Sequence, residues 1–442
     1  MTEQIKKVVL DSEKVLSSFK KNIDKIEARY KDGVEKYRKG NFTIKFLSSG
    51  QKTISIKQIK HKFLFGCNAF MLDSFESSDK EVLYKQKFSK IFNHAVVPFY
   101  WKDLEPQEDE LRFKKDSVKM YRRPAPDVVL DFCKEYDLQP KGHCLTWNWF
   151  TPDWLEKYNV DERKRLLEKR FKEISDEYAD KIPSFDIVNE SASNYNIGKK
   201  TLFDGYDEYS LKLGGKYFAN NKKILNEWNY AIWDTYVTSG KYMPFNMQLK
   251  DFIQKGYPID EIGLQFHMFT PAEKLDNDSF DVFLNVENHL DVLDVFNAYN
   301  LPMHISEITI PCYPYCLSQN EEIQAKLTEY FYKIWFSTPN MKSIVWWNLV
   351  DGYAAYAPRN SYEGENYYAG GLLKYDMAEK SSYKVLDNLI NNEWKTNIND
   401  TTNKNELSFK GFYGEYEITV TVGNKQQVKT VKFFDDNAVL EI

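Results

Sequence analysis

The chain has 442 residues, 42% of them apolar and 28% charged, and its 60 basic and 65 acidic residues leave a formal net charge of −5. This length is enough to bury one large core or two ordinary ones. The balanced charge provides no basic field for nucleic acid, and no apolar stretch approaches the ~20 residues of a membrane-spanning helix. We therefore expect neither nucleic acid nor a membrane as a partner.

The N-terminus and the cysteines indicate where the protein resides. The first residues, Met-Thr-Glu-Gln-Ile-Lys-Lys, lead into mixed charged and apolar positions without a signal-peptide apolar region. We expect a cytoplasmic protein, or a secreted one if a leader has been removed. The five cysteines do not resemble a disulfide framework, and no second Cys or His pair accompanies the C-x₃-C spacing of Cys312 and Cys316. We therefore expect no metal site.

The two ends of the chain have a similar pattern. Apolar residues recur every three or four positions from 12 to 39, which predicts an amphipathic helix. Two alternating runs, 43–47 and 53–59, flank Ser-Ser-Gly-Gln and predict a β-hairpin, and residues 416–422 and 428–434 alternate in the same way. We expect an N-terminal extension (1–60) and a C-terminal β tail (396–442) that pack together.

Residues 61–395 show a different pattern, in which short apolar runs alternate with helical segments. Helical patterns such as 162–178, 280–299 and 321–336 separate eight short apolar runs, at 63–70, 93–99, 140–147, 184–189, 222–228, 262–267, 302–308 and 343–350. Strand–helix alternation with buried strands is typical of a parallel sheet. Eight such units predict an α/β fold, a (β/α)₈ TIM barrel with small N- and C-terminal β extensions. Neither G-x-G-x-x-G nor G-x₄-G-K-[ST] occurs, and no cofactor is implied.

Polar and aromatic residues collect where the predicted strands end. In a TIM barrel these ends form the catalytic face. From the third to the eighth strand they supply His143 and Trp147, Asn189 and Glu190, Asn226 and Glu227, Gln265 and His267, Glu307, and Trp347 and Asp351. Two facing glutamates can flank a glycosidic bond as acid and nucleophile or base. Tryptophans offer flat surfaces to sugars, and seven lie at or just beyond strand ends: Trp101, Trp147, Trp149, Trp154, Trp228, Trp346 and Trp347.

Several of these strands resemble those of family 10 glycoside hydrolases, the retaining (β/α)₈ β-xylanases. The motifs occur in family order, as Gly-His-Cys-Leu-Thr-Trp147, Phe-Asp-Ile-Val-Asn-Glu190, Leu-Asn-Glu-Trp-Asn229, Ile-Gly-Leu-Gln-Phe-His267, Leu-Pro-Met-His-Ile-Ser-Glu307 and Val-Trp-Trp-Asn-Leu-Val-Asp351. The resemblance implies an endo-1,4-β-xylanase-like enzyme that hydrolyses β-1,4-linked xylan or xylo-oligosaccharides.

The resemblance also implies roles for single residues. Glu190 matches the general acid/base and Glu307 the nucleophile. Asn189, His143, Gln265 and His267 match positions that hold the sugar at the cleaved bond or orient the nucleophile, and Trp347 matches a platform beneath that sugar. Glu227, Asn226 and Asp351 are expected to support the site, and Trp147 to contact substrate.

The second strand departs from the family. Its Glu-Asn-x-Met-Lys-Trp appears as Val96-Val97-Pro98-Phe99-Tyr100-Trp101, so the polar residues that grip the next sugar, at the −2 position, are missing. Tyr100 and Trp101 remain as candidate substrate contacts. We interpret the chain as a divergent member. An exo-acting β-glycosidase on another short or decorated β-linked glycan is the main alternative, and a non-catalytic glycan-binding barrel is a weaker one.

Overall fold

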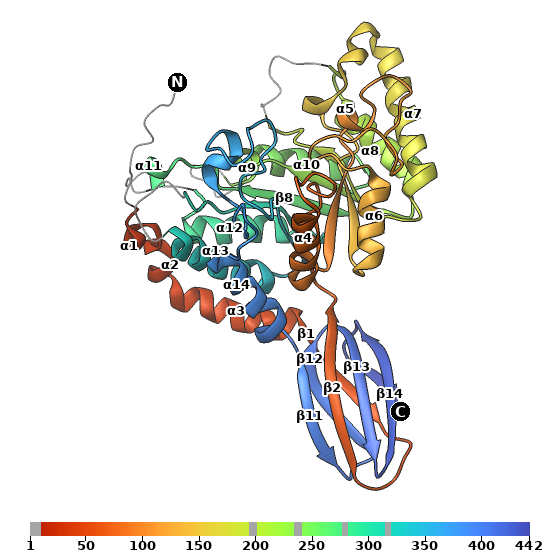
Figure 1. Ribbon diagram of the computed structural model, residues 1–442, viewed down its shortest axis with the longest axis vertical. Coiled ribbons are helices and arrows are strands. Elements are labelled where there is room, and N and C mark those ends of the chain that lie inside the picture. The colour runs from red at the N-terminus through yellow and green to blue at the C-terminus, as the bar shows by residue number, and fades with distance from the viewer. Residues whose placement is uncertain (1–9, 194–200, 234–240, 276–281, 314–319) are drawn as a thin grey trace.

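The structure, a computed structural model, describes residues 10–193, 201–233, 241–275, 282–313 and 320–442. Its centre is a closed barrel of eight parallel strands in the order β10-β3-β4-β5-β6-β7-β8-β9 (Figure 1). Each strand overlaps one of the eight predicted runs, so the predicted TIM barrel is confirmed: β3 Leu64–Asn68, β4 His94–Pro98, β5 Gln139–His143, β6 Ser184–Asn189, β7 Lys222–Glu227, β8 Glu261–His267, β9 Met303–Thr309 and β10 Met341–Trp346.

The barrel strands are covered on both faces, which explains why they read as continuous apolar runs. Every residue of β6, β8 and β9 is buried. The covering helices are α4 Ser78–Ile91, α6 Pro126–Glu135, α7 Val160–Tyr178, α8 Tyr206–Tyr217, α10 Pro244–Gln254, α12 Val286–Asn297, α13 Asn320–Ser337 and α14 Ser381–Asn388. Local sequence sets where they begin, because Pro126 and Pro244 occupy first turns and Asn159 forms a capping box with Glu162 at the start of α7.

Short helical turns fill the loops at the carboxyl ends of the strands and beyond the last helix. The α-helical ones are α5 Trp101–Leu104, α9 Asn229–Ile232 and α11 Ala272–Leu275. The remaining turns are η1 Asn148–Phe150, η2 Asp153–Lys157, η4 Gly364–Tyr368 and η5 Leu389–Glu393. Among the described residues, no helix has both the length and the apolar content to cross a membrane.

The described N-terminal region contains three helices in place of the single predicted one. They are α1 Ser12–Val15, α2 Ser17–Lys21 and α3 Ile23–Tyr37, interrupted at Leu16 and Asn22. Burial follows the expected apolar stripe, since Phe19, Ile26 and Val34 are all buried in the core that they share with the barrel. The stripe therefore predicted the buried face correctly but not the breaks.

Strands from both ends of the chain form two sheets beside the barrel (Figure 1). One has the order β12-β1-β15 and the other β11-β2-β13-β14. Their bounds are β1 Lys39–Lys45, β2 Lys52–His61, β11 Asn397–Thr402, β12 Glu406–Phe412, β13 Gly414–Val422, β14 Lys425–Phe433 and β15 Ala438–Glu441. The predicted hairpin is wrong, because β1 and β2 lie in different sheets. The division at residues 60 and 395 stays a prediction.

The two sheets enclose their own core. Alternate residues of β2 are buried, and Phe42 stacks on Phe433 with ring centroids 4.5 Å apart. Ile56 of β2 pairs with Ile418 of β13, and both side chains are buried. Inward-facing residues of two sheets thus form one apolar layer, as in a β-sandwich.

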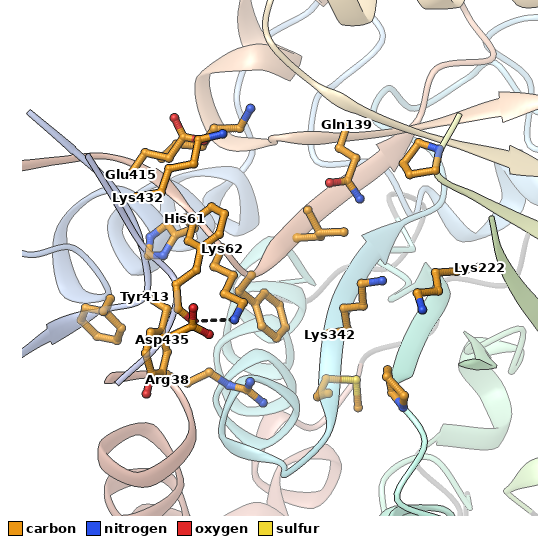
Figure 2. A pocket seen from close by; sticks show the side chains of 18 of the residues that line it. Arg38, His61, Lys62, Gln139, Lys222, Lys342, Tyr413, Glu415, Lys432 and Asp435 are labelled. Carbon is orange, nitrogen blue, oxygen red and sulfur yellow. Dashed lines mark hydrogen bonds and ion pairs between the residues drawn. The ribbon is translucent and has the colours of Figure 1, made fainter. Parts of the chain in front are cut away.

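A cavity of about 1250 Å³ lies between the sandwich and the barrel, lined by residues of both. Figure 2 shows that Gln139, Lys222 and Lys342, at the N-terminal ends of barrel strands, contribute side chains to it. Glu415 and Lys432 of the sandwich contribute others. This end of a TIM barrel generally serves stability, and the chemistry belongs to the opposite end.

Candidate active site

A second cavity, of about 580 Å³, lies at the carboxyl ends of the barrel strands. We call it the rim cavity. It is lined by Glu190 and Glu307 and by Phe70, Tyr100, Arg122, Arg123, His143, Trp147, Trp149, Phe150, Asn189, Trp228, Tyr230, His267, Phe269, Trp347, Ala355, Tyr356 and Glu365. Smaller than the cavity beneath the barrel, it nevertheless combines two buried carboxyl groups with aromatic walls, which fits a ligand site.

Glu190 follows β6 directly and is only 7% exposed. Its Oε1 accepts a hydrogen bond from Nε2 of Gln265 at 2.9 Å, and its backbone N–H donates to Asn226 O. Burial, together with the negative charges of Glu307 and Glu227, raises the pKa of Glu190 to about 8, against the opposing bond from Gln265. A carboxyl group with this pKa holds its proton at neutral pH.

Glu307 lies within β9 and is 4% exposed. Nδ2 of Asn226 donates to its Oε1 at 2.8 Å, and Nε2 of His267 lies 3.2 Å from its Oε2. Nδ2 of Asn226 also donates to Oδ1 of Asn189 at 2.7 Å. The Glu307 carboxyl group is therefore oriented by side chains of β7 and β8.

A buried ion pair orients His143. Oδ2 of Asp186 lies 2.7 Å from His143 Nδ1 and 2.8 Å from Lys141 Nζ. Burial opposes ionisation of Asp186, but the Lys141 charge and the His143 contact outweigh it and lower its pKa to about 2. Because a carboxylate only accepts, Nδ1 of His143 donates to it and Nε2 faces the Tyr100 hydroxyl at 3.1 Å. Asp186 lies within the Phe-Asp-Ile-Val-Asn-Glu190 motif, and its part in orienting His143 was not predicted from the sequence.

Two other acidic residues expected to support the site differ in position. Glu227 is buried and accepts from the backbone N–H groups of Ala192 (2.7 Å) and Trp228 (2.9 Å), and burial raises its pKa to about 7. It therefore fixes the loop after Glu190. Asp351 does not line the rim cavity; it accepts from Gly371 N at 2.7 Å and Lys380 Nζ at 3.0 Å, which joins the last barrel loop to residue 380.

The aromatic residues separate into two groups. Trp147, Trp149, Trp228 and Trp347 line the rim cavity, as does Tyr100. Trp101 is buried, and its Nε1 donates to Glu105 at 2.9 Å instead. Trp346 is also buried, with Nε1 donating to Gly370 O, and Nε1 of Trp154 donates to Glu105 O. The structure therefore brings four of the seven strand-end tryptophans to the cavity.

Several cavity residues come from loops that the motifs did not cover. Arg122 and Arg123 precede α6, Phe269 follows β8, and Tyr356 and Glu365 follow β10. Loops in such positions can contact substrate, but many surface loops share the same position. Gln265 does not line the cavity and acts on it through its bond to Glu190.

No group of three or more His, Cys, Asp or Glu residues arranged to hold a metal ion occurs in the part of the chain that the structure describes. Cys312 is buried with a free thiol. Cys316, its partner in the C-x₃-C spacing, lies outside the described residues.

The model of the family "Glycosyl hydrolase family 10" matches residues 56–387, which include the whole barrel and the cavity at its rim. The chain belongs to glycosyl hydrolase family 10. The family assignment accounts for six motifs in register and for the closed eight-stranded barrel.

Curated relatives of this family 10 chain are distant. It is 22% identical over 409 residues to anti-sigma-I factor RsgI6 of Acetivibrio thermocellus, and the match covers 89% of this chain but 46% of that protein. It is also 22% identical over 323 residues to endo-1,4-beta-xylanase A of Caldicellulosiruptor saccharolyticus, covering 67% of this chain and 84% of that protein. The chain thus spans less than half of the first relative.

Solved structures share the fold. The native xylanase 10B of Thermotoga maritima superposes with a TM-score of 0.57 at 20% identity, over 75% of this chain and 96% of that one. The quarter of this chain outside that match is comparable in size to the N-terminal helices and the sandwich combined.

Proposed function

We propose that this chain is a retaining glycoside hydrolase that cleaves β-1,4-linked xylan or xylo-oligosaccharides by double displacement. One observation carries the proposal: two buried glutamates share the rim cavity, and their surroundings differ. Glu190 has its pKa raised to about 8, whereas Glu307 accepts hydrogen bonds from neighbouring N–H groups. A carboxyl group that holds its proton, facing a second one held by N–H donors, matches the acid and the nucleophile that this reaction requires.

In the first step, an oxygen of Glu307 attacks the anomeric carbon while Glu190 gives its proton to the leaving oxygen. The bond from sugar to leaving group breaks, and a glycosyl ester of Glu307 forms. Asn226 and His267 hold the Glu307 carboxylate in place for attack. Trp347 and Tyr100 enclose the sugar ring, and Asn189 is placed to donate to a hydroxyl next to the reacting carbon.

In the second step, Glu190 has lost its proton and acts as a base. Esterification removes the charge of Glu307, and this charge is one of the three causes, with burial and the charge of Glu227, that raise the pKa of Glu190. The pKa of Glu190 therefore falls after the first step, so that the carboxylate persists long enough to take a proton from the attacking water. Water then releases the sugar with its original anomeric configuration.

Xylan is the proposed substrate because xylanases recur among the relatives, including xylanase A of C. saccharolyticus and xylanase B of Thermotoga neapolitana. A cytoplasmic location is also proposed. It is supported by the four described cysteines, which are buried and carry free thiols: Cys67, Cys133, Cys144 and Cys312.

The test is hydrolysis of aryl β-xylobiosides and xylo-oligosaccharides, followed by proton NMR of the anomeric signals. We expect the β-anomer to form first, and Glu307→Gln to remove turnover. Glu261→Gln is the matched control, because Glu261 is a buried barrel glutamate that contacts His304 and lies outside the rim cavity. Unchanged hydrolysis by Glu307→Gln, or α-anomer as first product, would refute the proposal.

A further inference from the structure

Two adjacent arginines line one end of the rim cavity. Arg122 and Arg123 are 3% and 8% exposed, so both cations are nearly withdrawn from solvent. Burying a charge is costly unless an opposite charge or several hydrogen bonds compensate for it. The partners of each guanidinium group therefore indicate what this end of the cavity can bind.

Arg123 has its counter-charge within the protein. Its Nε donates to Oδ2 of Asp103 at 2.5 Å, and its guanidinium carbon lies 4.5 Å from the centre of the Tyr100 ring. The hydroxyl of Tyr100 lies 3.1 Å from His143 Nε2. Tyr100 therefore contacts Arg123 through its ring and His143 through its hydroxyl.

Arg122 forms no direct ion pair of this kind, and the charge of Glu365 acts on it only from a distance. Its terminal nitrogens donate to two neutral oxygens, Tyr353 O and, at 2.7 Å, Oδ1 of Asn348. Its Nε has no hydrogen-bond partner within the described chain, and no carboxylate among the described residues forms an ion pair with it. The acidic neighbour is Glu365, which accepts from Nδ2 of Asn348 at 3.1 Å and thus lies across that amide.

We propose that this end of the cavity binds a carboxylate-bearing sugar, whose carboxylate pairs with Arg122. The inference rests on the proposed function, since the acidic sugar belongs to the glycan held at Glu190 and Glu307. A guanidinium group matches a carboxylate with two parallel N–H donors, and their pairing is strong where water is excluded. The substrate class is therefore an acidic β-linked oligosaccharide, such as xylan that carries uronic acid.

Glu365 provides a second test, because the proposal fixes the direction in which removing its charge changes the preference for the acidic glycan. As a like charge near the bound carboxylate it weakens binding, so removing its charge strengthens preference for the acidic glycan. If Arg122 and Glu365 instead bound hydroxyl groups of a neutral sugar, removing either would weaken binding of neutral and acidic glycans alike.

The experiment measures kcat/KM for a xylo-oligosaccharide and for the same backbone with one glucuronic acid branch. We expect wild type to have a higher kcat/KM for the acidic compound than for the neutral one. Arg122→Gln should lower kcat/KM for the acidic compound at least about tenfold more than for the neutral one. Arg122→Lys should show a preference between those of wild type and Arg122→Gln. Glu365→Gln increases the acidic preference. Arg359→Gln is the matched control, because Arg359 lies near the same loops but does not line the cavity.

Two results overturn the inference without affecting the proposed function. One is an equal loss of kcat/KM on both compounds in Arg122→Gln, and the other is a lower kcat/KM for both compounds in Glu365→Gln. Glu365→Gln leaves the Arg122 side chain in place, so it keeps the test decisive if Arg122→Gln melts early. If wild type hydrolyses neither compound, the proposed function fails. Calorimetric binding of the acidic compound to wild type and Arg122→Gln then tests the arginine separately, and equal affinities overturn the inference.

Discussion

Gln265 opposes the raised pKa of Glu190 through a single hydrogen bond. Its Nε2 donates to Oε1 of Glu190 at 2.9 Å, and this bond lowers the pKa of Glu190 because it stabilises the ionised form. Leucine at this position fills similar volume and donates nothing. A hydrogen bond to a charged group contributes about 1.5–3 kcal/mol, and one pH unit corresponds to about 1.4 kcal/mol. Gln265→Leu therefore raises the pKa of Glu190 by about one to two units.

The assay is the pH dependence of kcat/KM on a xylo-oligosaccharide, whose leaving sugar needs the proton of Glu190. The enzyme needs protonated Glu190 as its acid, so activity in the wild type declines above about pH 8. In Gln265→Leu the decline moves to higher pH, even though the maximal rate falls. Gln58→Leu is the control, because Gln58 is a buried glutamine of the sandwich that accepts from Thr396 N. A decline that begins at the same pH as in the wild type, or at a lower pH, in Gln265→Leu would refute the reasoning.

Three further predictions concern the buried charges. Glu190→Ala lowers kcat/KM for xylo-oligosaccharides about 10²–10⁴-fold but spares kcat/KM for aryl glycosides whose leaving groups need no proton, although kcat falls for both because the base of the second step is lost. Equal losses of kcat/KM on the two substrates would contradict the assignment. Glu190 holds a proton up to about pH 8 that the unfolded chain releases near pH 4.5, so the free energy of unfolding falls as pH rises through this range. Glu190→Gln should therefore raise the melting temperature at pH 8 more than at pH 5, and the reverse order would contradict the assigned burial. Asp186→Asn leaves Lys141 buried without an anion and costs about 3–5 kcal/mol in urea unfolding; Lys141→Met in the same chain should restore part of it, and no restoration would contradict the pairing.

The barrel and its paired glutamates were accessible from sequence for a physical reason. Parallel strands covered on both faces must be apolar throughout, so each strand stands out against the polar loop that follows it. Their carboxyl ends meet at one rim, and Glu190 and Glu307 therefore converge even though 117 positions separate them. Neither the barrel nor the convergence of the two glutamates depends on the conformation of a loop.

Features that depend on pairing partners or on side-chain direction were harder to predict. Alternation in β1 and β2 indicated which residues are buried but not which strand lies alongside, and β2 pairs with β13 from the far end of the chain. Trp346 and Trp347 are neighbours at a strand end and therefore face opposite sides, so only Trp347 reaches the cavity. Because alternate residues of a strand face the same side, their positions would have predicted that the two side chains point in opposite directions. Arg122 depends on a loop path that no periodicity encodes.

The central claim is that Glu307 forms a covalent bond to the sugar. The direct measurement is incubation with an activated 2-deoxy-2-fluoro-β-xylobioside, which slows release of the glycosyl-enzyme, followed by peptide mapping with mass spectrometry. We expect one sugar per chain, attached to the peptide that contains Glu307, and no label in Glu307→Gln. A label on Glu190 or Glu227, or no label while the compound still inhibits, would contradict the account.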